Sequence, residues 1–159
     1  MAALALLISM LVLPSPAGAV TTTTSMASTS ARAYSVPSSF DQGVLYYTNL
    51  ARRQHHRKPL RLMSCLDNFA TTWSAQMASR DVMGHQSLTT VLRTCGRRSV
   101  GENVGWGTND LTPRQLVGMW MRSPAHRHNI LKRSFRLIGI GAYRSTSSGR
   151  IYATQEFGR

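Results

Sequence analysis

Two kinds of hydrophobic periodicity follow one another along this chain, and their order restricts the fold more than any other feature. Three segments repeat apolar residues at the spacing of an α-helix, and two later segments alternate apolar residues as β-strands do. Helical segments that precede a run of strands are typical of α+β proteins. We therefore predict an α+β fold, layered helix–sheet–helix, with a small antiparallel sheet.

The first two predicted helices carry apolar stripes at the i, i+4, i+7 and i+11 positions. The first helix covers 40–54 and ends at the basic stretch before Pro59. The second begins at Ser64, which we expect to cap it together with Asp67, and Gly84 ends this helical region. The stripes consist of Phe40, Val44, Tyr47 and Ala51, and of Leu66, Ala70, Trp73 and Met77.

The third helix has the strongest start signal in the chain. Thr112, Pro113 and Gln115 match an N-cap, a first-turn proline and a capping box. A second cap-and-proline pair, Ser123-Pro124, interrupts this helix and predicts a further helical turn through residue 131.

The predicted strands lie near the C-terminus. Residues 137–144 and 150–157 alternate, and the polar joint 145–149 makes them a β-hairpin. A short strand over 100–104 adds to the sheet. A hairpin alone is marginally stable, so helices must cover its faces.

The N-terminal 39 residues are predicted to be an export signal and a linker. Residues 1–19 hold an apolar run broken by two prolines, followed by a small-residue cleavage site at Ala19. A membrane anchor is the alternative, but it needs about 18 or more continuous apolar residues. Residues 20–39 are Thr/Ser-rich with no apolar period, which predicts a disordered linker. We expect a secreted, monomeric protein with its folded domain over 40–159 and no membrane span in the mature chain.

Cys65 and Cys95 are the two cysteines of the chain, and they form no CxxC motif. The spacing therefore does not indicate a zinc or thioredoxin-like site. In an oxidising compartment such a pair is predicted to form a disulfide, and two unpaired buried thiols are the alternative.

Three residues could combine into a site. His85 lies in the loop after the second helix, Glu102 follows a glycine, and His126 lies at a helix start. Two imidazoles and one carboxylate match the ligands of an open zinc site and also suit acid–base chemistry. Structural histidines without such a role are the alternative. Ser123 precedes His126 by three residues, but a capping role accounts for it, so no nucleophile with a convincing base is visible.

Short motifs follow one another along the chain: Asn49-x-x-Arg52, Pro59-Leu60, Gly84-His85, Gly101-Glu102-Asn103-Val104, WMxSPxHRxNIL over 120–131, Ile138-Gly139-Ile140-Gly141 and Tyr152-x-x-Gln155-x-Phe157-Gly158. In this order they resemble the CAP superfamily of cysteine-rich secretory proteins, antigen 5 and pathogenesis-related proteins, in its bacterial SCP-like branch. The resemblance implies a helix–sheet–helix sandwich with a cleft of two histidines and two glutamates that can bind a divalent cation, commonly zinc. By position, His85, His126 and Glu102 correspond to three of these ligands, and Ser123 stands where the second glutamate falls.

The charge is strongly one-sided, with 19 Lys+Arg against six Asp+Glu and a formal net charge of +13. This excess predicts attraction to the anionic partners that an exported protein meets, such as wall polymers, phospholipid head groups or acidic glycans. The cations are scattered without interleaved aromatic residues, so sequence-specific binding of nucleic acid is not expected. A solvated face biased toward arginine by genome composition is the alternative.

These observations predict a secreted binding or effector module. Its cleft, lined by His85, Glu102, His126 and Ser123, would hold a lipid, a glycan or a partner protein, with zinc as the cation that the first three could bind. The first alternative is a metal-assisted extracellular hydrolase that uses His85, Glu102 and His126. The second is a basic protein that binds envelope polyanions.

Overall fold

The computed structural model describes residues 33–35, 38–108 and 110–159, so the expected export signal and most of the expected linker lie outside the described residues. The described elements follow one another as β1 (Ala33–Ser35), α1 (Ser38–Gln54), β2 (Arg61–Leu62), α2 (Ser64–Arg80), α3 (Leu88–Thr94), β3 (Val100–Gly107), α4 (Pro113–Arg122), α5 (Pro124–Leu131), β4 (Leu137–Ser145) and β5 (Ile151–Gly158). The elements β1 and α1 thus begin before residue 40, where the folded domain was expected to begin.

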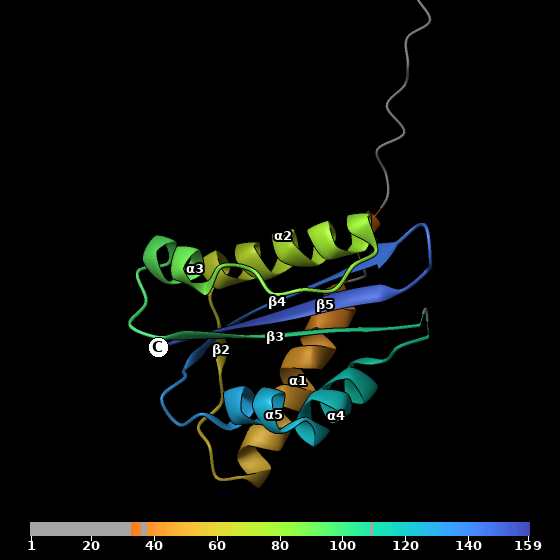
Figure 1. The fold of residues 1–159 in the computed structure, drawn as a ribbon. Helices are drawn as coiled ribbons and strands as arrows, with labels where there is room; N and C mark the ends of the chain where they lie inside the picture. The colour runs from red at the N-terminus through yellow and green to blue at the C-terminus, as the bar shows by residue number, and fades with distance from the viewer. Residues whose placement is uncertain (1–32, 36–37, 109) are drawn as a thin grey trace, which may run out of the picture.

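The sheet lies between two helical layers (Figure 1). Helices α2 and α3 cover one face, and α1, α4 and α5 cover the other. The predicted α+β fold with helix–sheet–helix layers is therefore confirmed. The larger core lies between the sheet and α1, α4 and α5, where Val44, Leu116, Ile130 and Phe135 are fully buried.

The strand order is β1-β4-β5-β3, with antiparallel neighbours throughout. The short β2 pairs with β4 in parallel, through Arg61 with Leu137 and Leu62 with Ile138. The sheet is therefore mixed, not purely antiparallel as expected. The reason is that the segment between α1 and α2 runs beside β4 for two residues, in the same direction as that strand.

Most predicted elements are confirmed. The helix α1 ends at Gln54 as predicted, β4 and β5 form the hairpin, and β3 extends beyond the predicted strand to Gly107. At the start of α4, Thr112 and Gln115 form the reciprocal capping box. The seven-residue helix α3, in which Val91 is the buried residue, was not predicted.

The predicted cap of α2 is wrong. Met63 occupies the N-cap position, and no side chain caps this end of the helix. The Asp67 carboxylate instead accepts a hydrogen bond from the backbone N–H of Ile140 in β4, at 3.0 Å. The helix ends at Arg80 rather than at Gly84, because Asp81 adopts a left-handed conformation with φ of 55°.

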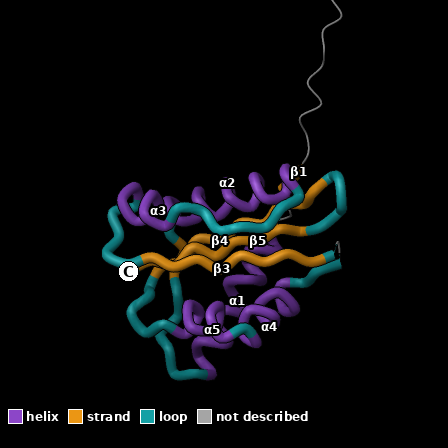
Figure 2. Tube along the Cα trace, in the orientation of Figure 1, coloured by secondary structure: helices purple, strands orange, loops and turns teal. Residues whose placement is uncertain are grey.

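Two glycines in β4 let α2 lie directly on the sheet. A Cβ atom on Gly139 would lie 2.1 Å from the backbone carbon of Leu66, and one on Gly141 would lie 2.4 Å from the Cα atom of Thr71. After α2 the chain turns and runs back along the sheet toward α3 (Figure 2). This return loop carries His85 over the sheet.

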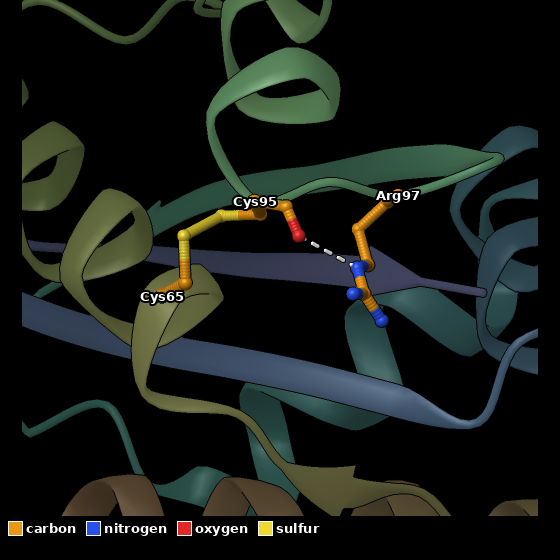
Figure 3. The surroundings of a disulfide bond; sticks show 3 residues. All are labelled: Cys65, Cys95 and Arg97. Carbon is orange, nitrogen blue, oxygen red and sulfur yellow. Dashed lines mark hydrogen bonds between the residues drawn. A yellow bond between two sulfur atoms is a disulfide. The ribbon is translucent and has the colours of Figure 1, made fainter.

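The predicted disulfide between Cys65 and Cys95 is confirmed, with an S–S distance of 2.07 Å (Figure 3). It joins the first turn of α2 to the residue that follows α3. The Arg97 side chain donates a hydrogen bond to the carbonyl oxygen of Cys95, at 2.7 Å. Within the described ranges, no helix is long and apolar enough to cross a membrane.

Candidate functional site

A buried carboxylate on β3 orients a histidine in the return loop. The Nδ1 atom of His85 lies 2.5 Å from Oε1 of Glu102. The side chain of Glu102 is 1% exposed, whereas that of His85 is 63% exposed. Since Nδ1 is engaged, Nε2 is the imidazole nitrogen left for a ligand or a proton.

Glu102 belongs to a pair of carboxyl groups that share one amide. Glu156 on β5 lies directly across from Glu102 in the sheet register. The Nε2 atom of Gln86 donates to Oε2 of Glu102, at 3.0 Å, and to Oε1 of Glu156, at 2.8 Å. Among the described residues, Oε2 of Glu156 has no hydrogen-bond partner, although the residue is fully buried.

The environment of Glu156 favours its protonated form. Burial raises the pKa of Glu156 to about 10, and the adjacent carboxyl group of Glu102 raises it further. Glu156 is therefore protonated at neutral pH and can donate to its neighbour. The carboxyl group of Glu102 holds the His85 ring through Nδ1.

His126 lies in the first turn of α5, near enough to His85 for the two imidazoles to interact electrostatically. Burial lowers the pKa of His126, and the nearby His85 lowers it further. Two amides fix α5 against β3. Asn103 donates to the carbonyl oxygen of His126, at 3.2 Å, and Asn129 donates to that of Glu102, at 2.9 Å.

A cavity of about 550 Å³ adjoins His126. Apolar side chains form most of its wall, and Thr108, Ser123 and His126 are its polar lining residues. Ser123 is the N-cap residue of α5, yet its side chain makes no cap hydrogen bond, so the predicted capping role is wrong for the hydroxyl. The apolar lining consists of Met83, Val104, Trp106, Met119 and Trp120.

The geometry does not support the predicted ligand set. In the described part of the chain, no three His, Cys, Asp or Glu side chains are grouped so that they could hold a metal ion. Glu102 is committed to Nδ1 of His85 and to Gln86, and Ser123 brings no charge. The residues present therefore do not fit a three-ligand zinc centre.

Sequence reasoning missed two members of this cluster, Gln86 and Glu156. Gln86 directly follows His85, so its position beside a predicted site residue was an available signal. Glu156 lies in an alternating strand, and its role follows only from the pairing of β3 with β5.

Residues 45–157 match the family described as the cysteine-rich secretory protein family, CAP. The chain belongs to this family. At 32% identity over 138 residues it is also similar to the uncharacterized protein YkwD of Bacillus subtilis (strain 168), with 82% of this chain and 52% of the relative covered. The CAP chain thus spans about half the length of that relative.

Solved structures share the CAP fold of this chain. An outer surface protein from Borrelia burgdorferi superposes with a TM-score of 0.69 at 15% identity, covering 79% of this chain and 97% of that one. An extracellular protein containing an SCP domain from Bacillus anthracis superposes with a TM-score of 0.63 at 22% identity, covering 77% of this chain and 41% of that one.

Proposed function

We propose that this CAP domain is a secreted binding module that holds a small amphipathic molecule, such as a single-chain lipid, in the cavity beside His126. The observation that carries the proposal is where exposed apolar side chains gather. Three of the six large exposed hydrophobic residues of the described chain line this one cavity: Met83 (47% exposed), Trp106 (39%) and Met119 (41%). Apolar surface that is concentrated at a concave site indicates a ligand.

The size and the polarity of the cavity define the ligand. Its volume of about 550 Å³ lies within the range that small-molecule sites occupy. The apolar wall suits a hydrocarbon chain or ring. The lowered pKa of His126, which also lines the cavity, favours a neutral imidazole at neutral pH. This imidazole can donate a hydrogen bond to the oxygen of a head group, or accept one from it.

Several features support a location outside the cell. The sequence predicts an export signal over residues 1–19, and the domain holds a disulfide of the kind that persists in oxidising compartments. The similar solved structures include an outer surface protein and an extracellular protein.

The hydrolase alternative has weaker support. In the described region no hydrogen bond joins Ser123 to His126, and the metal that it would use does not fit the cluster. His85 and Glu102 form an oriented pair, but no nucleophile is hydrogen-bonded to the imidazole among the described residues.

The binding proposal can be tested by energy transfer, because Trp106 and Trp120 line the cavity. Dansyl-undecanoic acid is the probe, and its dansyl emission is followed while tryptophan is excited. Met119→Ser should weaken binding about five-fold, the loss expected for about 1 kcal/mol of apolar contact. Leu62→Ser removes an exposed apolar side chain outside the cavity and should change affinity less than about two-fold. Failure of the parent protein to saturate, or equal affinity of parent and Met119→Ser, would refute the proposal.

A further inference from the structure

A second concave site lies on the layer of α1, α4 and α5. This basic groove has a volume of about 950 Å³ and is lined by ten residues. Five of them are cations, two more are histidines, and none is Asp or Glu. The cations are Arg57, Arg122, Arg127, Lys132 and Arg133. The groove shares no lining residue with the cavity beside His126, so it is a separate site, and the inference drawn for it does not rest on the ligand proposed for that cavity.

The positive charge of the groove is not neutralised from within. The ion pairs recorded among the described residues join His85 to Glu102 and Arg150 to Asp81, and neither involves the groove. Cations that converge in a concave site repel one another and focus a positive potential there. An anion that enters the groove would relieve this repulsion.

A buried arginine fixes the walls of the groove. Arg52 donates to the carbonyl oxygens of Lys58, at 2.8 Å, and Phe135, at 3.1 Å, and also to that of Ile130. Arg57 donates from Nε to the carbonyl oxygen of Leu131, at 2.9 Å. The loop after α1 is thereby tied to the end of α5, so the backbone on both sides of the groove and the Arg57 side chain are held in place before a ligand arrives. Such preorganisation lowers the cost of binding.

We propose that the basic groove binds a linear polyanion with repeated phosphate groups, such as a phosphodiester-linked wall polymer or inorganic polyphosphate. Arginine recognises phosphate oxygens through parallel N–H donors, and four of the five cations are arginines. A groove of about 950 Å³ with five cations in its lining has room and charge for several phosphates, so it suits a chain of phosphates better than a single one.

Two other polyanions fit the groove less well. Nucleic acid that is bound as a single strand stacks its bases on aromatic side chains, and no aromatic residue other than the two histidines lines the groove. A bilayer surface needs exposed apolar anchors, and none of the six large exposed hydrophobic residues of the described chain lies here.

The test measures the affinity of the full chain for end-labelled polyphosphate, by fluorescence anisotropy at several NaCl concentrations. The groove variant is Arg127→Gln/Arg133→Gln, in which both residues are exposed. The matched control is Arg93→Gln/Arg98→Gln, which removes the same charge from exposed positions in and after α3, in the other helical layer. Thermal unfolding of both variants should match that of the parent, and Arg133→Gln alone replaces the groove variant if it does not.

The groove variant should lose about ten-fold in affinity, and the slope of log K against log salt should fall by roughly 1.5, because two phosphate contacts are lost. The control should change affinity less than about two-fold. Equal losses in the two variants would overturn the proposal, because net charge alone would then explain binding. Tighter binding of a single-stranded DNA of matched charge, or of vesicles containing anionic lipid, would overturn it in favour of those ligands.

Discussion

Glu156→Gln is the substitution that tests the charge state of the buried carboxyl pair. Glutamine has nearly the shape of a protonated glutamic acid, so its oxygen can still accept from Gln86 and its amide can donate to Glu102. At neutral pH the parent residue is already uncharged, since its pKa is raised to about 10. The substitution should therefore preserve the fold and change how stability depends on pH.

The expected magnitude follows from the linkage between protonation and folding. The ordinary pKa of this carboxyl group is 4.5, and the folded value is about 10. Between these two values the folded state binds one more proton than the unfolded state, so the free energy of unfolding falls as pH rises. The loss from this group approaches about 1.4 kcal/mol per pH unit. Glu156→Gln removes this pH dependence. The free energy of unfolding of the variant should therefore rise steadily relative to that of the parent as the pH rises.

The assay is urea denaturation of parent and variant from about pH 6 to about pH 9, with the difference in the free energy of unfolding plotted against pH. Half-buried Asp41, whose pKa is raised to about 7 by burial and by nearby Asp67, is common to both proteins and cancels in this difference. Asp110→Asn is the control. This carboxyl group is exposed and its pKa is lowered, chiefly by the hydrogen bond from Thr108, so it does not titrate in the pH range of the assay. The free energy of unfolding of this variant should therefore change with pH as that of the parent does. Parallel curves for Glu156→Gln would show that Glu156 is ionised in the folded protein and that the reasoning is wrong.

Two further predictions concern stability. Cys65→Ala/Cys95→Ala should lower the free energy of unfolding by roughly 3–4 kcal/mol, because the bridge closes a loop with a sequence separation of 30; urea denaturation measures this, and an unchanged midpoint would contradict it. Gly139→Ala should cost about 3 kcal/mol or more, because its Cβ would lie 2.1 Å from the backbone of Leu66, a contact that flexible side chains cannot relieve. Gly84→Ala is the control, because no atom lies within 4 Å of a Cβ atom placed on Gly84. Thermal unfolding compares the two variants, and equal melting temperatures would disprove the steric argument.

The sequence predicted the helices and the hairpin because their apolar residues recur with clear periods. The capping box of α4 was equally clear from the sequence, since its hydrogen bonds join Thr112 and Gln115, three residues apart, to each other and to their own backbone. Asp67 has the same kind of local signal, but its carboxylate satisfies a backbone N–H of β4 instead. The donor, Ile140, is 73 residues away in the sequence, so the residues around Asp67 do not indicate this hydrogen bond.

The site, too, was predicted only where its residues carry a signal in the local sequence. His85 and Glu102 do meet, and the CAP motifs placed them in one cleft. The carboxyl pair depends on the register of β3 against β5, which puts Glu156 opposite Glu102. A shift of one residue would send these side chains to opposite faces of the sheet, and alternation within each strand cannot fix that register.

The eight-residue helix α5 connects both proposed ligand sites to the sheet. His126 lines the cavity, and the next residue, Arg127, lines the basic groove. Asn129 donates to the backbone of β3, and Ile130 is fully buried in the core. Because consecutive residues of one short helix face different surroundings, a shift of α5 would move the cavity and the groove together. A ligand in one site that changes the affinity of the other would therefore act through this helix, and Asn129→Ala, which removes its bond to β3, should weaken that coupling.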